Sequence, residues 1–323
     1  MSLRKFIKSN FNYDVSDLSA YVDEQRNELL TRQVTEARTL QLINIQTGIK
    51  HAEKLKLLND TIIYQDGDCG MTPQGDTEFS DRVITVKTLG FMKEFCNKDL
   101  EGFWTQLGLR AGAMAEDKDL PFQQQLVNFI LEKHALQLDN LIWKGDENLP
   151  SGNLSKMNGF NKLLTLANGC IDINGGYSAI TSSNAYALFY DAYLAMQAVN
   201  ASLTEDNDTV FFCGVETLSK LRLNMINLNF FTFTPNLNAN TQPLFGTSKI
   251  VEAVPGLAGT NKIFIGKRSE MVFGTDLTSD LDNFELWYSQ DADKIFMRSK
   301  FRAGVQVPFL DQIGVFDPTN SPS

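Results

Sequence analysis

The sequence predicts a mixed α+β fold, for three reasons. Apolar residues make up 43% of the 323 residues and charged residues 21%, so there is enough apolar surface to bury a core. Residues 122–142 repeat apolar side chains at helical spacing, and strand-like segments lie on both sides of them. These helices and strands do not alternate regularly, as they would in a doubly wound parallel sheet. The length predicts one or two cores.

The chain is acidic, with 29 Lys and Arg against 39 Asp and Glu and a formal net charge of −10. A sequence-specific DNA-binding protein usually presents a basic face, so we do not expect that class here. The first ten residues, MSLRKFIKSN, lack the apolar stretch of a secretory signal, and no apolar run reaches 18 residues. The sequence therefore predicts neither export nor a membrane-spanning helix.

The N-terminal part predicts an arm. Residues 1–32 are polar with scattered apolar positions, and such a segment usually needs a partner surface to become ordered. From residue 33 to 58 the pattern is amphipathic, broken by Gly48, and predicts a helix in its first half.

A long hairpin is expected next. Residues 61–64 and 82–87 have strand character, and the 17 residues between them are rich in turn formers. A loop of this length in a compact domain normally has a function. It carries no Lys or Arg but five acids: Asp66, Asp68, Asp76, Glu78 and Asp81. We interpret it as an arm that reaches a neighbouring subunit; the alternative is a plain surface hairpin.

The strongest helix signal follows. Asp119 and Pro121 are typical of a helix start, and Gly145 is typical of a helix end. About 23 residues at 1.5 Å each give a rod of roughly 35 Å.

The second half mixes both element types. Helical patterns lie near residues 183–201 and 215–225, and strand patterns near 209–213, 250–254, 262–265 and 271–274. Residues 284–288 and 294–304 read as paired strands, and the tail 317–323 as frayed. The second of these strands carries four bases and no acid between residues 294 and 302: Lys294, Arg298, Lys300 and Arg302.

Motifs for catalysis, cofactors or metals are missing. There is no GxGxxG, GxxxxGK[ST] or GxSxG pattern, and residues 256–262 fit only a turn. His51 and His134 lie outside any metal-binding or catalytic arrangement, and no acidic cluster has calcium-loop spacing. The four cysteines form no CxxC pair and predict free thiols. The sequence therefore predicts no enzyme, no cofactor and no metal.

The order of these parts resembles the major capsid proteins of tailed bacteriophages with the Hong Kong 97-type shell fold. Four segments carry the resemblance: DGDCGMTPQGDTEFSDR at 66–82, VITVKTLGFMKEFCNKDLEGFW at 83–104, LIWKGD at 141–146 and GFNKLL at 159–164. They look similar to capsid proteins of phages that infect Bacteroidetes, including the crAss-like group. No single segment is specific, but their order extends over most of the chain.

The resemblance implies a domain plan. It places an N-terminal arm at residues 1–58, an extended loop at 59–90, and a peripheral domain at 91–175 with a spine helix at 119–144. It further implies an axial domain at 176–283, return strands of the peripheral domain at 284–316, and a flexible tail at 317–323. In this family the extended loop lies across the peripheral domain of an adjacent subunit, and hexamers and pentamers tile an icosahedral shell around double-stranded DNA.

The charge pattern adds a hypothesis of its own. We expect the acidic loop tip to dock on or near the basic return strand of a neighbour, with more effect on orientation than on stability. Some relatives join this loop covalently to a neighbour through a lysine. Residues 59–81 contain no lysine here, so we do not expect cross-linked shells.

The resemblance also implies the partners: copies of the same chain, a portal, decoration or head auxiliary proteins, and packaged DNA held without sequence preference. No membrane partner is expected, and the location would be the virion capsid, assembled in the host cytoplasm. Two alternatives stay open. One is an encapsulin-like protein compartment with the same fold, and the other is an enzyme with a mixed α/β domain.

Overall fold

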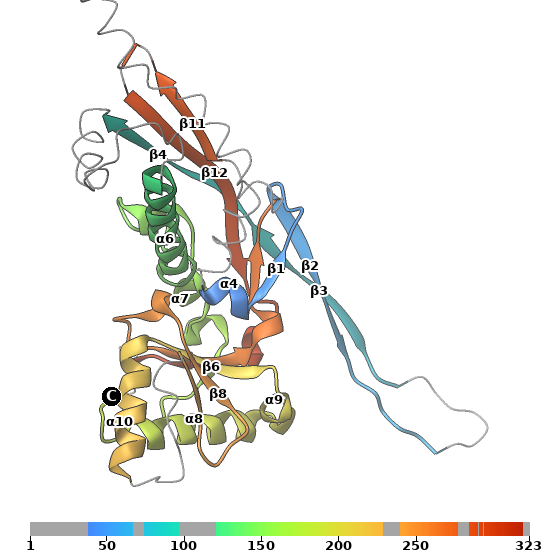
Figure 1. Cartoon of the computed structure of the whole chain (residues 1–323). Coiled ribbons are helices and arrows are strands. Elements are labelled where there is room, and N and C mark those ends of the chain that lie inside the picture. The colour runs from blue at the N-terminus through green and yellow to red at the C-terminus, as the bar shows by residue number, and fades with distance from the viewer. Residues whose placement is uncertain are drawn as a thin grey trace, which may run out of the picture.

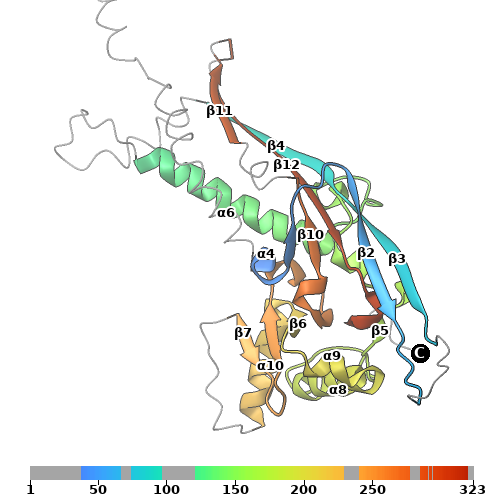
Figure 2. The ribbon, with the colours of Figure 1, turned by 90° about the vertical axis from the view of Figure 1, so that its right-hand side faces the viewer.

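The computed structural model describes residues 38–66, 74–96, 121–228, 240–276, 284–289, 291–292 and 294–318. They form two packed β-sheet domains, one above the other in Figure 1, and a two-stranded hairpin that projects from one side. Figure 2 shows the same two domains from the side, with β2 and β3 at the right.

The six-stranded domain lies at the bottom of Figure 1. Its sheet has the strand order β5-β13-β9-β6-β8-β7, and β6 (Thr209–Cys213) is buried at all five residues. Helix α8 (Ala185–Val199) buries one face in this core, as its helical apolar spacing predicts. The remaining elements are β5 (Ile171–Asp172), β7 (Thr241–Pro243), β8 (Ile250–Ala253), β9 (Ile263–Lys267), β13 (Gly314–Phe316), α9 (Ala201–Glu205) and α10 (Val215–Asn227).

The five-stranded domain is built around β12 (Lys294–Gln306). Strand β12 pairs antiparallel with β4 (Lys87–Cys96), β11 (Phe284–Ser289) and β10 (Val272–Gly274), and β10 pairs parallel with β1 (Asn44–Gln46). The long helix α6 (Pro121–Lys144) packs beside this sheet (Figure 1). Short helical turns complete the domain: α4 (Arg38–Leu42), α7 (Phe160–Leu163), η1 (Asn153–Lys156), η2 (Leu166–Asn168) and η6 (Leu310–Gln312).

Helix α6 joins the two domains through a buried clamp. The Asp139 carboxylate accepts the backbone N–H of Thr39 at 3.0 Å and that of Gly256 at 2.7 Å. One turn later, the Trp143 indole N–H donates to the Thr39 hydroxyl at 2.7 Å. A Cβ at Gly256 would overlap the Asp139 carbonyl oxygen and the Trp143 ring. Glycine at this position therefore lets η3 (Pro255–Leu257) lie directly against the helix.

The hairpin consists of β2 (Ala52–Asp60) and β3 (Thr77–Thr85) in continuous antiparallel register. At its base Ile84 is buried and packs with Ile49 and Val86. Next to it, Arg82 donates to the Val307 carbonyl at 3.3 Å and the Val83 carbonyl accepts from Gln306 at 2.7 Å. Beyond these contacts the hairpin projects from the body in Figure 1.

Most predicted elements are confirmed. The long helix starts at Pro121 and ends at Lys144, and the backbone N–H of Gly145 donates to the Leu141 carbonyl just beyond it. The helices expected near residues 183–201 and 215–225 and the strands of the second half are present within a few residues of their predicted bounds.

The helix predicted in the first half of residues 33–58 is present in part, and residues 33–37 lie outside the described part. Helix α4 covers only residues 38–42 of the described part, and the chain then enters β1 and β2. The apolar positions of this segment serve two sheets: Ile43 and Ile49 are buried in different clusters. Spacing alone cannot separate such positions from one helical face.

The hairpin also begins earlier than predicted. Its first strand is residues 52–60, and residues 61–64, expected as a strand, follow it without strand structure. The predicted arm, residues 1–58, is therefore divided: residues 1–37 lie outside the described part, 38–51 belong to the body, and 52–58 belong to the hairpin.

Two strands belong to a different domain from the one expected in the domain plan that the resemblance implies. Strand β10, within the expected axial range 176–283, pairs in the five-stranded sheet, and β13, within the expected return strands, pairs in the six-stranded sheet. The chain thus crosses between the domains at η4 (Arg268–Glu270) and again after β12. The first residue of the expected tail is held by an ion pair, because the Asp317 carboxylate lies 2.6 Å from the Lys262 ammonium group. Residues 319–323 lie outside the described part.

Candidate assembly surfaces

The hairpin exposes large apolar side chains to solvent. Leu58 and Phe79 are direct cross-strand partners and are 59% and 82% exposed. Beyond the strands, Ile62 and Tyr64 are 71% and 92% exposed. A two-stranded ribbon is marginally stable by itself, and a cluster of exposed apolar groups is typical of an interaction surface. The sequence prediction of an interaction surface rested on the acids. It interpreted residues 61–64 as a strand and did not use their apolar side chains as a signal of contact.

The predicted acids lie on the same hairpin. Asp66, Asp76, Glu78 and Asp81 are exposed, and Asp68 lies outside the described residues. Of the four, Asp81 has an ion pair within the hairpin, to Lys54 at 2.7 Å. Acidic and apolar groups therefore occupy one projecting element.

The predicted bases lie on β12 at alternate positions and so share one face of the sheet. We call Lys294, Arg298, Lys300 and Arg302 the basic stripe. The opposite face of β12 meets α6, because Phe301 packs edge-on to His134 at 5.1 Å between ring centroids. The stripe therefore lies on the sheet face turned away from the long helix.

Three of the four stripe residues already have acidic partners in their own chain. Lys294 binds Glu94 at 2.9 Å, Arg298 binds Glu285, and Arg302 binds Asp276. Arg298 also lies 5.5 Å over the Trp287 ring. Lys300 is exposed and has no ion pair among the residues that the structure describes. The structure does not bring the acidic hairpin and the stripe together within one chain.

A groove between α6 and β4 was not anticipated from the sequence. It encloses about 530 Å³, and its apolar lining comes from both elements and from β12: Leu89, Phe91, Ile130, Leu138, Leu141 and Phe301. Three lysines also line it: Lys93, Lys133 and Lys156. The alternation of β4 places Leu89, Phe91 and Lys93 on one face, but only the register of β4 against β12 shows that this face meets α6.

His134 is one of the residues that line this groove. Its ring is 5.0 Å from that of Phe91 and 5.1 Å from that of Phe301. Burial lowers the pKa of the imidazole to about 4, so the ring is neutral at pH 7. Its Nε2 is buried and has no hydrogen-bond partner among the described residues. A buried nitrogen without a partner is costly.

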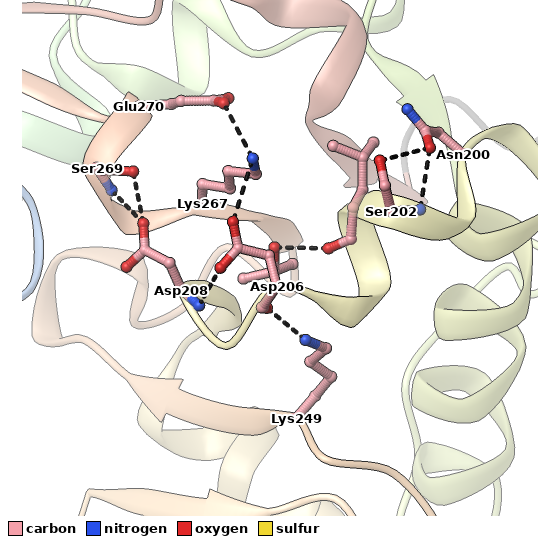
Figure 3. Close-up of polar contacts among 10 residues, drawn as sticks. Asn200, Ser202, Asp206, Asp208, Lys249, Lys267, Ser269 and Glu270 are labelled. Carbon is pink, nitrogen blue, oxygen red and sulfur yellow. Dashed lines mark hydrogen bonds and ion pairs between the residues drawn. The ribbon is translucent and has the colours of Figure 1, made fainter.

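A second polar cluster lies where the chain crosses between the domains (Figure 3). Asp208 accepts both the backbone N–H of Ser269 at 2.9 Å and its hydroxyl at 2.5 Å. The Asp206 carboxylate forms an ion pair with the Lys267 ammonium group at 3.2 Å. The backbone carbonyl of Asp206 accepts a hydrogen bond from Lys249 Nζ at 2.5 Å. These contacts hold η4 against the turn before β6 and so fix the joint between the sheets.

Glu270 is the most perturbed acid of that cluster. Burial raises the pKa of its carboxyl to about 7, although Lys267 lies 3.9 Å away and opposes the shift. The acids Asp206, Asp208 and Asp311 contribute in the same direction as burial. Its sequence context, RSEM, carries no signal of this, because the burial depends on the packing of the joint.

Three further observations concern metal binding, membrane crossing and the thiols of the described residues. Within these ranges no group of His, Cys, Asp and Glu side chains is arranged to hold a metal ion. No described helix is both long and apolar enough to cross a membrane. Cys170 and Cys213 are free thiols whose pKa values are raised by burial, as expected for structural cysteines.

Known proteins resemble this chain in structure and not in sequence. No family model matches the sequence, and no curated protein matches it significantly. Solved structures do match. A chain of the satellite phage P4 procapsid, solved with the size determination (Sid) protein, has a TM-score of 0.55 at 12% identity and covers 90% of this chain and 98% of its own.

Two further structures agree. The capsid of an empty GTA particle matches with a TM-score of 0.55 at 12% identity, covering 87% of this chain and 89% of that one. The capsid of the Myoviridae phage XM1 matches with a TM-score of 0.52 at 14% identity, covering 86% and 90%. The predicted fold class is confirmed: the chain has the mixed α+β, Hong Kong 97-type fold of phage shell proteins.

Proposed function

We propose that this chain is the major capsid protein of a tailed bacteriophage and self-assembles into hexamers and pentamers of an icosahedral shell. The observation that carries the proposal is the projecting hairpin: it exposes Leu58, Tyr64 and Phe79 on an element that its own body does not cover. A subunit with a donor element on one side and acceptor surfaces elsewhere makes heterologous contacts, which close into rings. The shell fold supports the same conclusion.

The protein would have a structural role and no catalytic one. Its partners would be copies of itself, a portal, decoration or head auxiliary proteins, and packaged double-stranded DNA. The net charge of −10 fits an inner wall that does not bind DNA tightly. The resemblance to phages of Bacteroidetes, including the crAss-like group, is part of this proposal, as are the virion location and assembly in the host cytoplasm.

The hairpin would dock on the five-stranded domain of the neighbour. In the simplest version, Asp66, Asp68, Asp76, Glu78 and Asp81 face the basic stripe. The exposed acids support this version. The partners that Lys294, Arg298 and Arg302 already have weigh against a strong contribution from those three, because docking would have to exchange one exposed pair for another.

Electron microscopy of the purified full-length chain tests the proposal. Uniform closed shells tens of nanometres across, built from one protein of 36.2 kDa, are expected. Particles from infected cells should protect double-stranded DNA from nuclease. Shells that contain a co-purifying enzyme and no DNA would favour the encapsulin-like compartment, and a protein that stays monomeric at high concentration would contradict both.

A further inference from the structure

We propose that Glu270 makes the joint between the two sheet domains sensitive to pH. While its carboxyl is neutral, η4 stays against the turn before β6, and once the carboxyl is ionised, burial of the charge and repulsion from the surrounding acids weaken that contact. The inference concerns the single unassembled chain, so it does not depend on the proposed shell function.

Glu270 lies where the chain crosses from one domain to the other. It is the last residue of η4, which links β9 of the six-stranded sheet to β10 of the five-stranded sheet. The chain crosses back through η6, between β12 and β13, and Asp311 lies on that crossing. Two of the segments that join the domains therefore carry an acid each, and the charge of Glu270 bears on the joint itself.

The other residues of η4 are held by polar contacts. The backbone N–H of Arg268 donates to the Asp208 carbonyl at 3.2 Å, and the Arg268 guanidinium pairs with the buried Glu252 at 3.0 Å. The Ser269 backbone N–H and hydroxyl both donate to the Asp208 carboxylate. Because these two donors fix the Asp208 carboxylate against η4, its negative charge cannot turn away from the segment that carries Glu270.

The Glu270 carboxyl is poorly placed for a charge of its own. Its Oε2 is buried and has no hydrogen-bond partner among the residues that the structure describes. Figure 3 shows the Lys267 ammonium group between two carboxyls, 3.2 Å from that of Asp206 and 3.9 Å from that of Glu270. Lys267 is therefore shared, and its closer partner is Asp206. A buried carboxylate without hydrogen bonds is costly, and a neutral carboxyl costs less.

The charges that act on Glu270 are mostly negative. Asp206 and Asp208, from the turn before β6, and Asp311, from η6, all oppose ionisation, whereas Lys267 at the end of β9 favours it. Strand β1 also contacts η4, and its residues, 44–46, carry no charge. Burial, supported by the three acids, raises the pKa of the Glu270 carboxyl to about 7, so its charge changes in the neutral range.

Rising pH should therefore open the joint locally. When η4 moves away from the turn, the carboxyl reaches water and its pKa returns toward the ordinary value of 4.5. The open form then loses its proton at a lower pH than the closed form, so the open fraction grows with pH until the closed form is ionised as well. The two pKa values give an increase of about tenfold in the open fraction between pH 6 and pH 8.

Hydrogen exchange of the unassembled full-length chain at pH 6 and pH 8 tests the proposal. Protection factors are compared, because they remove the intrinsic effect of pH on exchange. The reporters are the backbone amides of Arg268 and Ser269, which both donate to Asp208. Their protection should fall about tenfold between the two pH values, while that of the paired amides of β2 and β3, which can open without the joint, should stay constant. Low urea concentrations should not change the fall, since a local opening exposes little surface. Constant protection at the reporters, or a fall that depends on urea, would overturn the proposal.

A variant that cannot ionise provides the second measurement. E270Q keeps a neutral polar group of similar shape, so its reporter amides should be equally protected at both pH values. The matched control is E132Q, at an exposed glutamate of α6, which should show the same fall of about tenfold as the unmodified chain. A fall that survives in E270Q, or one that is lost in E132Q, would assign the pH response to another group and exclude Glu270. Thermal melting of both variants at pH 6 checks that they fold.

Discussion

The hairpin and β6 of the six-stranded domain both carry large apolar side chains, but the domain buries them and the hairpin exposes several of them. In the domain, Phe211 and Phe212 of β6 are fully buried, each in a different core cluster. In the hairpin, Leu58 and Phe79 form a cross-strand pair that is mostly in solvent. The body completes its core within one chain, whereas the hairpin has apolar surface without a core. This difference is the reason for proposing that the hairpin packs on another copy of the chain.

The largest effect is expected from removing the exposed apolar side chains of the hairpin. Replacing Ile62, Tyr64 and Phe79 together with serine should abolish assembly, because the apolar contact area of the tip is lost. The melting temperature of the unassembled chain should not fall, since these side chains contribute nothing to either core. Sedimentation velocity and differential scanning calorimetry measure the two quantities.

The matched control removes an exposed leucine elsewhere. Leu149, in the loop after α6, is 41% exposed, and L149S should leave both assembly and melting unchanged. If the triple serine variant melts at a clearly lower temperature, the tip packs on its own body and the comparison fails.

In the body of the molecule, removing a buried side chain is expected to lower folding stability. Trp143 is fully buried, packs on Phe160, Phe212 and Phe264, and donates to Thr39. W143A should lower the free energy of unfolding by about 3–5 kcal/mol, because it leaves a large cavity and an unpaired hydroxyl. Urea denaturation of the unassembled chain measures this. Leu136, 42% exposed on the same helix, is the control, and an equal loss in L136A would show that helix propensity and not packing is being measured.

A smaller effect is expected at the clamp. Asp139 is buried and its two carboxylate oxygens accept one backbone N–H each, from Thr39 and Gly256. In D139N the amide can accept only one of these, and the other N–H loses its partner, which costs about 1–3 kcal/mol. Hydrogen exchange should speed up at the backbone amide of Gly256 or Thr39 and not throughout α6. Uniformly faster exchange along the helix would contradict the clamp.

The sequence predicted the parts that depend on local periodicity. The long helix has a start signal at Asp119 and Pro121, a stop at Gly145 and apolar positions on one face, so it could be identified without tertiary information. The basic stripe followed from the alternation of β12. The hairpin strand at residues 52–60 was missed because Leu55, Leu57 and Leu58 can serve either period when no partner strand is known.

The groove and the joint could not be predicted. His134 lies on a helix whose position against β4 is set by contacts more than 40 residues apart in the chain, and Glu270 is buried only because two domains meet there. The resemblance gave the fold class, but β10 and β13 exchange domains relative to the expected plan. These are properties of packing, and no local pattern encodes them.

The smallest effect is the pH dependence of stability of the unmodified chain, to which Glu270 and His134 contribute with opposite signs. Glu270 has a pKa of about 7 in the folded chain against an ordinary value of 4.5, so between these values the folded chain holds a proton that the unfolded chain has lost, and its contribution to stability falls as pH rises. His134 has a pKa of about 4 against an ordinary 6.5, so the unfolded chain holds the extra proton and the contribution rises with pH. From about pH 4.5 to 6.5 the two proton differences cancel, and stability should be nearly flat.

Replacing one of the two groups should reveal the effect of the other on the pH dependence of stability. In E270Q only the imidazole contribution remains, so the free energy of unfolding should increase between about pH 4.5 and 6.5; in H134Q only the carboxyl contribution remains, so it should decrease. Urea titrations of the unassembled chain across that range give both slopes, with E205Q, at an exposed glutamate of α9, as the control that matches the unmodified chain. Equal slopes in the two variants would mean that neither group titrates as its burial requires.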